Sequence, residues 1–420
     1  MKFIFLKPLG ILLFVFLPSG LILAQEPDST AKDFVSEGFK VRTFVMNMTD
    51  FAKVTSIRKP LFLGVNGIQI TTFTKENNWW KNGMFSTYIL NTFGDNPTTD
   101  FVGDDQMFDN AESFPDTNNH IHIGKGQLNY RTFIYSLYYQ HFFKNSRLLV
   151  GQYDLNFDFA FSNIGLNFIN SSFGIQPTLS YNVPSFSTFP FTNLTMRYEH
   201  DINENVAFRA AVAQGVGGNQ LTNPHSTKYV ETFKDGGLFM ISEISRSNFK
   251  NGILLSECKF GVWGHTGSKS MHFRNYTNKA DTISNHFNFG AYFIADKLIK
   301  AEVNDSSQGL YAFIDLGWAP GDYNIFNYYA GGGLSYTGLF PKRNADVISL
   351  ALATPFYSNG IVKVDQFSLT EKALELNYNF VSNYFNFQPC IQYLANIGGA
   401  KGIEKVVFML RIASHKGIFY

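Results

Sequence analysis

Three observations predict that this chain is an all-β protein that crosses a membrane as an antiparallel up-and-down barrel. Aromatic residues make up 17% of the chain and charged residues only 16%, whereas soluble domains carry roughly 25% charged residues. Beyond the N-terminal region, no stretch approaches the ~18 consecutive apolar residues of a transmembrane helix. Many segments instead alternate apolar and polar residues, as strands with one lipid-facing and one water-facing side do.

The clearest alternating segment is a hairpin at residues 192–213. On its first arm Met196 is followed by Arg197, and on its second arm Phe208 is followed by Arg209. Side chains of a strand point to opposite faces with period two, so the two arginines share one face and require water there. One hairpin alone would also fit a soluble sandwich, which keeps its apolar face inward.

Sixteen segments follow this rhythm, each bounded by Gly, Asn, Asp or Pro. They are residues 39–47, 61–74, 84–93, 128–142, 147–160, 192–200, 205–214, 237–246, 252–265, 286–296, 309–318, 325–337, 347–357, 372–380, 385–394 and 405–413. An even number suits a bacterial barrel with about 16 strands and with both termini in the periplasm.

The connections mostly alternate between short and long, as this topology requires. The short ones are expected to be periplasmic, namely 143–146, 201–204, 247–251 and 381–384. The long ones are expected to be external, namely 94–127, 161–191, 215–236 and 266–285. Two connections, 297–308 and 319–324, break the alternation, so either a strand limit is misplaced there or these hairpins are atypical.

The N-terminus predicts export. Lys2 and Lys7 precede an apolar run, and Ala24 provides a small residue for cleavage, so residues 1–24 are expected to be a signal peptide and 25–420 a single barrel domain. Its removal would leave 32 basic and 33 acidic side chains. This balance argues against nucleic acid as a partner and leaves outer-membrane lipid and small neutral solutes.

The connection 161–191 contains no Asp, Glu, Lys or Arg but has six Phe residues. A long, uncharged, aromatic loop is poorly suited to the cell surface, so we expect it to fold into the lumen. There it would bury its aromatic residues and narrow the pore. The alternative is that the loop packs over the barrel rim as a plug without selectivity.

Strand 252–265 is expected to place Lys259, Trp263 and His265 on the water-facing side, opposite Cys258 and Phe260. An aromatic ring beside hydrogen-bonding groups is suited to holding a sugar. Trp263 would equally fit an aromatic girdle at the membrane interface.

Asp154, Asn156 and Asp158 alternate with apolar residues in the predicted strand 147–160, so they too are expected to face the lumen. A wall of mixed charge suits polar neutral solutes, although ion pairing within the wall is the simpler role for any single member. The complete set of predicted pore-lining or substrate-binding residues is Arg131, Asp154, Asn156, Arg197, Arg209, Glu243, Lys259, Trp263, His265, Asp315, Glu375 and Arg411.

Signals for an enzyme are weak. The nine His are dispersed, and there is no Cys-x-x-Cys or His-x-x-x-His spacing and no Gly-x-Ser-x-Gly motif. We therefore expect no catalysis, no cofactor and no metal. Cys258 and Cys390 are expected on opposite faces, and hence both free.

Several ordered stretches resemble the carbohydrate-selective outer-membrane porin family of the OprB type. They are Gly151-Gln-Tyr-Asp-Leu-Asn156, Phe168-Ile-Asn170, Pro177-Thr-Leu-Ser180, Gly261-Val-Trp-Gly-His-Thr-Gly267, Gly309-Leu-Tyr-Ala-Phe313, Ala319-Pro-Gly-Asp-Tyr-Asn324, Arg343-Asn-Ala-Asp-Val347, Glu375-Leu-Asn-Tyr378, Gln388-Pro-Cys-Ile-Gln392 and Gly398-Gly399. The resemblance implies a sixteen-stranded barrel through which sugars diffuse.

Together these observations predict a passive porin for carbohydrates or similar neutral solutes in the outer membrane of a Gram-negative-type bacterium. The alternative is a non-conducting surface barrel with a structural or adhesive role. The sequence leaves the sugar, the open or closed state of the pore and the choice between monomer and trimer undecided.

Overall fold

The computed structural model describes residues 34–36, 39–74, 81–113, 120–123, 126–183, 186–216, 236–268, 286–303, 305, 307–321, 324–358, 367–382 and 385–414. The predicted signal peptide at residues 1–24 lies outside the described residues. So does most of the two predicted external connections 215–236 and 266–285.

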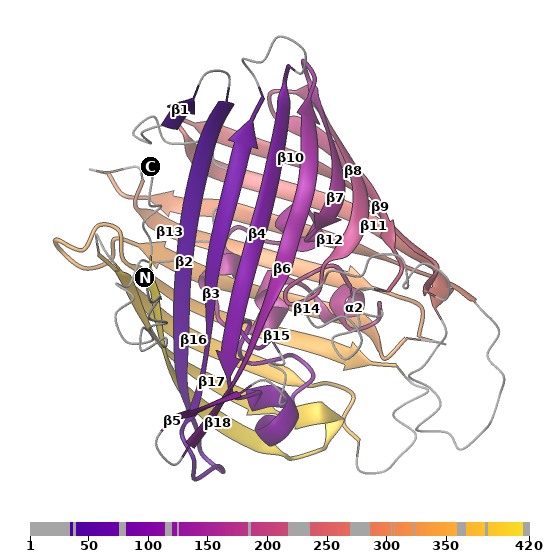
Figure 1. The fold of residues 1–420 in the computed structure, drawn as a ribbon. Coiled ribbons are helices and arrows are strands. Elements are labelled where there is room, and N and C mark those ends of the chain that lie inside the picture. Colours follow the sequence, from indigo (N-terminus) through magenta and orange to yellow (C-terminus); the bar gives the residue numbers. More distant parts are fainter. Residues whose placement is uncertain are drawn as a thin grey trace, which may run out of the picture.

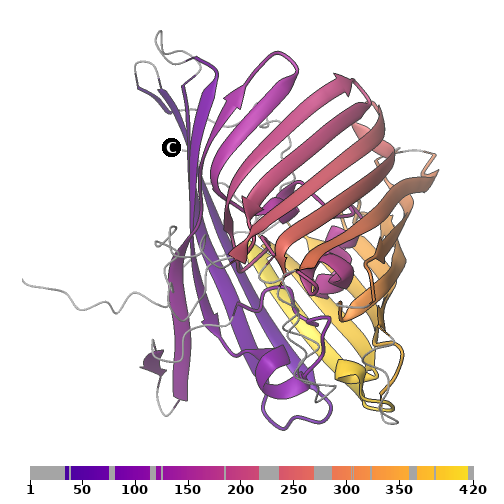
Figure 2. The ribbon, with the colours of Figure 1, turned by 90° about the vertical axis from the view of Figure 1, so that its right-hand side faces the viewer.

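Sixteen antiparallel strands form the closed barrel, which confirms the predicted fold (Figures 1 and 2). Their bounds are β2 Phe39–Val54, β3 Leu61–Phe73, β4 Gly83–Gly94, β6 Gly126–Phe142, β7 Ser146–Tyr153, β8 Asn193–Asn203, β9 Val206–Gln214, β10 Leu238–Lys250, β11 Ile253–Ser268, β12 His286–Ala301, β13 Gly309–Trp318, β14 Phe326–Thr337, β15 Val347–Tyr357, β16 Lys372–Val381, β17 Phe385–Ala395 and β18 Glu404–Ser414.

Each strand pairs with the next barrel strand along the chain, and β18 pairs with β2 to close the ring. Two further strands stand outside this count: β1 (Phe34–Ser36) pairs with β2, and β5 (His120–Ile123) pairs with β6. The first residue of β2 and the last residue of β18 lie at one end of the barrel, together with tight turns such as 143–145, 204–205 and 251–252. We call this the turn end. The opposite end, which carries the long connections, is the loop end.

Several predicted strand limits differ from the structure; the predicted strand 39–47, for example, extends to Val54. The predicted strand 147–160 ends at Tyr153, because Asp154 caps a 3-10 helix, Leu155–Phe157, with its side chain. Leu155 and Phe159 then pack inside the barrel, so their alternation imitates a strand without forming one. The strand β12 continues to Ala301, which shortens the connection 297–308 to 302–308. The next connection, 319–325, is equally short although it lies at the loop end, so it remains an exception to the alternation.

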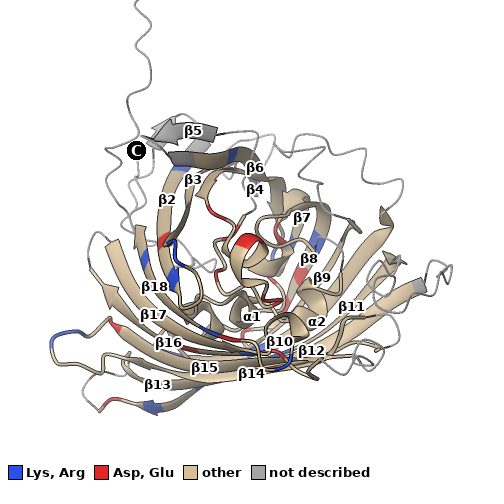
Figure 3. Ribbon diagram, turned by 90° about the horizontal axis from the view of Figure 1, so that it is seen from below, with Lys and Arg blue, Asp and Glu red and all other residues tan. Residues whose placement is uncertain are grey.

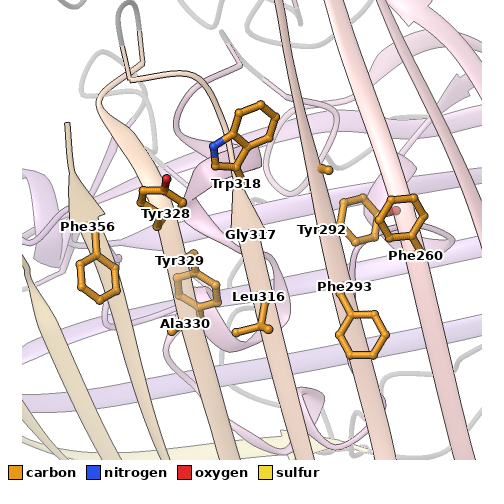
Figure 4. Close-up of a pocket in the computed structure, with 11 residues that line it drawn as sticks. Phe260, Tyr292, Phe293, Leu316, Gly317, Trp318, Tyr328, Tyr329, Ala330 and Phe356 are labelled. Atoms are coloured by element: carbon orange, nitrogen blue, oxygen red, sulfur yellow. The ribbon is translucent and has the colours of Figure 1, made fainter.

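The outward side chains form the apolar surface expected of a membrane barrel. Met196 is 54% exposed, and Phe260 and Phe408 are comparably exposed, whereas the intervening residues face inward. An apolar depression of about 530 Å³ lies on this outer surface, where Phe260, Phe293, Trp318 and Phe356 surround small residues (Figure 4). Its position and lining suit lipid, so it is not part of the solute path.

The two cysteines are free, as predicted: Cys258 is exposed beside Phe260 and Cys390 is buried on the inner side. The helices are short: the π-helix Thr98–Val102, the 3-10 helices Leu155–Phe157, Gly165–Asn167 and Ile397–Gly399, and the α-helices α1 (Ser171–Gly174) and α2 (Pro177–Ser180). None of the helices in the described part of the chain is long and apolar enough to span a membrane.

Candidate constriction and inner wall

The connection between β7 and β8, which we call the constriction loop (residues 154–192), folds into the barrel. Figure 3 shows its helices α1 and α2 inside the ring of strands. Phe159, Phe173 and Phe186 are almost fully buried, and each such burial contributes about 1.5–3 kcal/mol. The aromatic side chains of the loop, which made a position at the cell surface implausible, therefore pack it against the barrel wall.

Wall carboxylates hold the backbone of this uncharged loop. Glu375 accepts hydrogen bonds from the backbone N–H groups of Ile169 and Asn170, both at 2.8 Å. Glu243 accepts one from the N–H of Ala160 at 3.2 Å. An irregular loop has no ladder partners for these buried donors, and leaving them unpaired would cost about 1–3 kcal/mol each. The carboxylates supply the missing acceptors.

Three further wall residues complete this attachment. Lys259 donates to the carbonyl oxygen of Phe161 at 2.9 Å, and its ammonium lies 3.5 Å from the centre of the Phe161 ring. Asp296 accepts from the N–H of Asn163 at 2.9 Å. Asp315 accepts from the side chain of Gln176 at 3.3 Å. These wall residues are engaged by the loop and are thus removed from direct contact with a passing solute.

A ladder of ion pairs runs from the constriction loop toward the turn end along β7 to β10. Arg197 binds Asp158 of the loop at 3.0 Å and also Glu199. Glu199 further pairs with Arg147 at 3.0 Å and with Arg209 at 3.1 Å. Arg209 reaches Glu243 at 3.3 Å. We call this set the ion-pair ladder: every member has a partner of opposite sign.

A second inserted segment, residues 95–113 of the connection after β4, was expected to be external. Phe108, Asp109 and Glu112 are fully buried, and Arg411 of β18 binds Asp109 at 3.1 Å. The segment 95–119 contains seven acidic residues and no Lys or Arg. This excess of acidic residues is the sequence feature that could have predicted the inward position, because the acidic residues need basic partners elsewhere in the chain. Arg411 is one such partner.

Trp263 and His265 face inward, but neither borders open lumen. Trp263 is only 4% exposed and belongs to a buried cluster with Ile175, Leu179 and Phe186 of the constriction loop. Nε2 of His265 lies 2.5 Å from the carbonyl oxygen of Gly215. The indole ring of Trp263 is therefore packed against the loop and the wall and does not have the open face that a stacked sugar requires.

The remaining predicted residues also point inward. Arg131 lies buried with its guanidinium 3.9 Å from the centre of the Phe133 ring. Asp154 accepts a hydrogen bond from the hydroxyl of Tyr135 and caps the following helix, and Asn156 donates to the carbonyl oxygen of Phe159 at 3.1 Å. Contrary to the prediction, neither residue sits on a strand face.

The acidity of the inserted loops depends on burial. Burial raises the pKa of Asp154 to about 7, and it raises the pKa of Asp104 in the second inserted segment to about 7. The unfolded value is about 3.9, so the folded loops bind these protons more tightly. The stabilising contribution is complete below about pH 4 and is lost as the pH rises through about 7.

We therefore expect single-channel conductance to rise between pH 5 and pH 8 as the loops loosen. Asp154→Asn, which imitates the neutral acid, should remove part of this rise. Asp305→Asn, at an exposed position in the turn 302–308, should leave it intact. A conductance that does not change with pH would show that these carboxyls do not control the packing of the loops.

Comparison with known proteins agrees with this geometry. The model of the carbohydrate-selective porin, OprB family, matches residues 74–414. The chain belongs to this family. As a member it is a carbohydrate-selective porin, a channel for passive diffusion across the outer membrane. No curated protein sequence is significantly similar to the chain.

Solved structures support the same fold. The chain is similar to Pseudomonas putida OprB at high pH, with a TM-score of 0.72, 18% identity and coverage of 90% of this chain and 94% of that one. For the low-pH structure of the same protein the values are 0.55, 15%, 90% and 92%. A variant of Rh. blastica porin has a TM-score of 0.51 at 10% identity, covering 89% and 99%.

Proposed function

We propose that small neutral carbohydrates cross this barrel beside the constriction loop, along the ion-pair ladder of β7 to β10. The observation that supports this path is that its charged residues are paired: Arg147, Arg197 and Arg209 each lie 3.0–3.3 Å from a carboxylate. Paired charges present hydrogen-bonding groups without a strong net field, which suits neutral polar solutes and selects weakly between ions.

The exposed surface of the loop supports this path. Asn163 and Asn167, like Asn156 and Asp158, are partly exposed although most of the loop is buried. Amides and carboxylates are the groups that bind sugar hydroxyls. Seven of the predicted site residues thus fall into two groups. Glu243, Lys259, Asp315 and Glu375 position the loop, and Arg197, whose side chain is only 4% exposed, anchors it through Asp158. Asn156 and Arg209 contribute to the solute path. Neither group calls for catalysis or a cofactor.

The surroundings of the barrel follow from the same proposal. We infer that residues 1–24 are removed on export, that the turn end faces the periplasm and that the apolar belt lies in the outer membrane of a Gram-negative-type bacterium. Near the turn end, Tyr139, His141 and Phe143 have neighbouring rings, as in the aromatic girdles of membrane barrels.

Liposome swelling tests the proposal. Proteoliposomes should swell faster in neutral monosaccharides than in amino acids of equal size, and planar bilayers should show ohmic conductance steps. Equal rates for both solute classes would refute carbohydrate preference. Silent bilayers together with absent swelling would show that the path beside the constriction loop is closed.

A further inference from the structure

A second hollow lies at the turn end of the barrel, beyond the ion-pair ladder. Its volume is about 490 Å³, within the range of small-molecule sites. Its lining comes from the connections 143–145 and 204–205 and from the ends of β8, β9 and β10. Among the lining residues are the polar residues Asn145, Asp201, Asn203, Glu204 and Asn205 and the aromatic residue Phe249.

The hollow opens from the inner wall. Ser245 and Ser247 pair in register with Lys259 and Glu257, which are buried on the inner side of β11. Arg209 borders the hollow and also belongs to the ion-pair ladder. A solute that leaves the constriction along this ladder therefore meets the hollow next.

Its chemistry combines an aromatic face with many hydrogen-bonding groups. Phe249 is 56% exposed, so its apolar ring is available for stacking. Around it stand three Asn amides, two Ser hydroxyls and the carboxylates of Asp201 and Glu204. Sugars require this combination, because their C–H faces pack on a ring while their hydroxyls bind polar groups.

The ion pairs at the hollow favour a neutral ligand over an anion, and the Glu204 carboxylate adds an acceptor for sugar hydroxyls. Asp201 is paired with Arg147 at 3.2 Å, and Arg209 is paired with Glu199 and Glu243. The hollow is also preformed at its rim: the Asn203 side chain accepts from the N–H of Asn205 at 2.9 Å. The backbone N–H of Ser247 donates to the carbonyl of Asn205 at 2.8 Å. A preformed site loses little freedom when it binds.

We propose that this hollow is a second carbohydrate-binding site, at the periplasmic mouth, where one sugar ring stacks on Phe249 while Ser245, Ser247 and the turn amides bind its hydroxyls. The inference rests on the proposed path along the ion-pair ladder and adds an exit site to it. It also replaces Trp263 by Phe249 as the aromatic residue that a sugar contacts.

The test is sugar block of ion current in planar bilayers, with glucose as the probe. Phe249→Leu should weaken the blocking constant about fivefold, equivalent to about 1 kcal/mol for one lost stacking contact. Phe249→Tyr, which keeps the ring, should restore the wild-type constant. The ion conductance of both variants should match the wild type, which shows that the barrel is intact.

Phe143→Leu is the matched control, because Phe143 is 55% exposed near the same end but contacts His141 in the outer aromatic belt. It should leave the block unchanged. An unaltered blocking constant in Phe249→Leu would overturn the exit site. If liposomes with the wild-type protein swell faster in sugars than in amino acids, the proposed path stands without the exit site. If they swell equally fast in both, the path itself is refuted.

Discussion

Deleting Ser171 to Ser180 is expected to raise single-channel conductance by roughly twofold or more, because the deletion removes α1 and α2 from the lumen. Discrimination between sugars of different size should fall with it. Single-channel recording and liposome swelling measure the two effects. A folded variant with wild-type conductance would show that these helices lie outside the route of the ions.

A point variant tests whether moving the constriction loop, without shortening it, also changes conductance. A Cβ added to Gly317 would lie 1.5 Å from Oε1 of Gln176 and 2.1 Å from the hydroxyl of Thr178. Gly317→Val must therefore shift these two side chains, and we expect it to displace α2 with them. It should raise conductance in the same direction as the deletion. Gly321→Ala is the control, because the nearest atoms lie 3.5 Å from the added carbon; it should leave conductance unchanged.

Arg411→Met is expected to lower the free energy of unfolding by about 3–5 kcal/mol, the cost of breaking a buried ion pair from one side. The Arg411 guanidinium binds Asp50 at 2.7 Å across the seam between β18 and β2, and binds Asp109 of an inserted segment at 3.1 Å. Both carboxylates are fully buried. The substitution therefore leaves the Asp50 and Asp109 carboxyl groups without their basic partner. Urea unfolding in detergent measures the loss.

Arg343→Met provides the matched comparison. Arg343 binds Asp346 at 2.7 Å in a turn between β14 and β15, and its own side chain is 42% exposed. The buried Asp346 carboxylate keeps hydrogen bonds from the Tyr378 hydroxyl and the N–H of Val381, so the loss should be about 0–1 kcal/mol, as for exposed pairs. Combining Arg411→Met with Asp50→Asn should recover part of the lost stability by removing one unpaired charge. Equal losses in Arg411→Met and Arg343→Met would contradict the structural role assigned to the seam.

The sequence by itself determined the barrel. Alternation with period two is a local property, so residues such as Met196 and Arg197 indicate opposite faces without knowledge of any neighbour. The same rule predicted sixteen strands, the inward direction of Lys259 and Trp263, and the separation of Cys258 from Cys390. The absence of charge from 161–191 also predicted a loop inside the lumen, because solvation depends on composition rather than on contacts.

Only the tertiary structure decided what each inward residue does. Glu375 and Arg209 follow the same sequence pattern, but Glu375 meets two loop N–H groups, whereas Arg209 lies in the ion-pair ladder beside an open hollow. Trp263 likewise cannot stack on a sugar, because it is buried in one cluster with Leu179 and Phe186. Period two specifies a face, but the course of a loop without regular periodicity is set by long-range packing, and that packing determines which part of the face remains open to a solute.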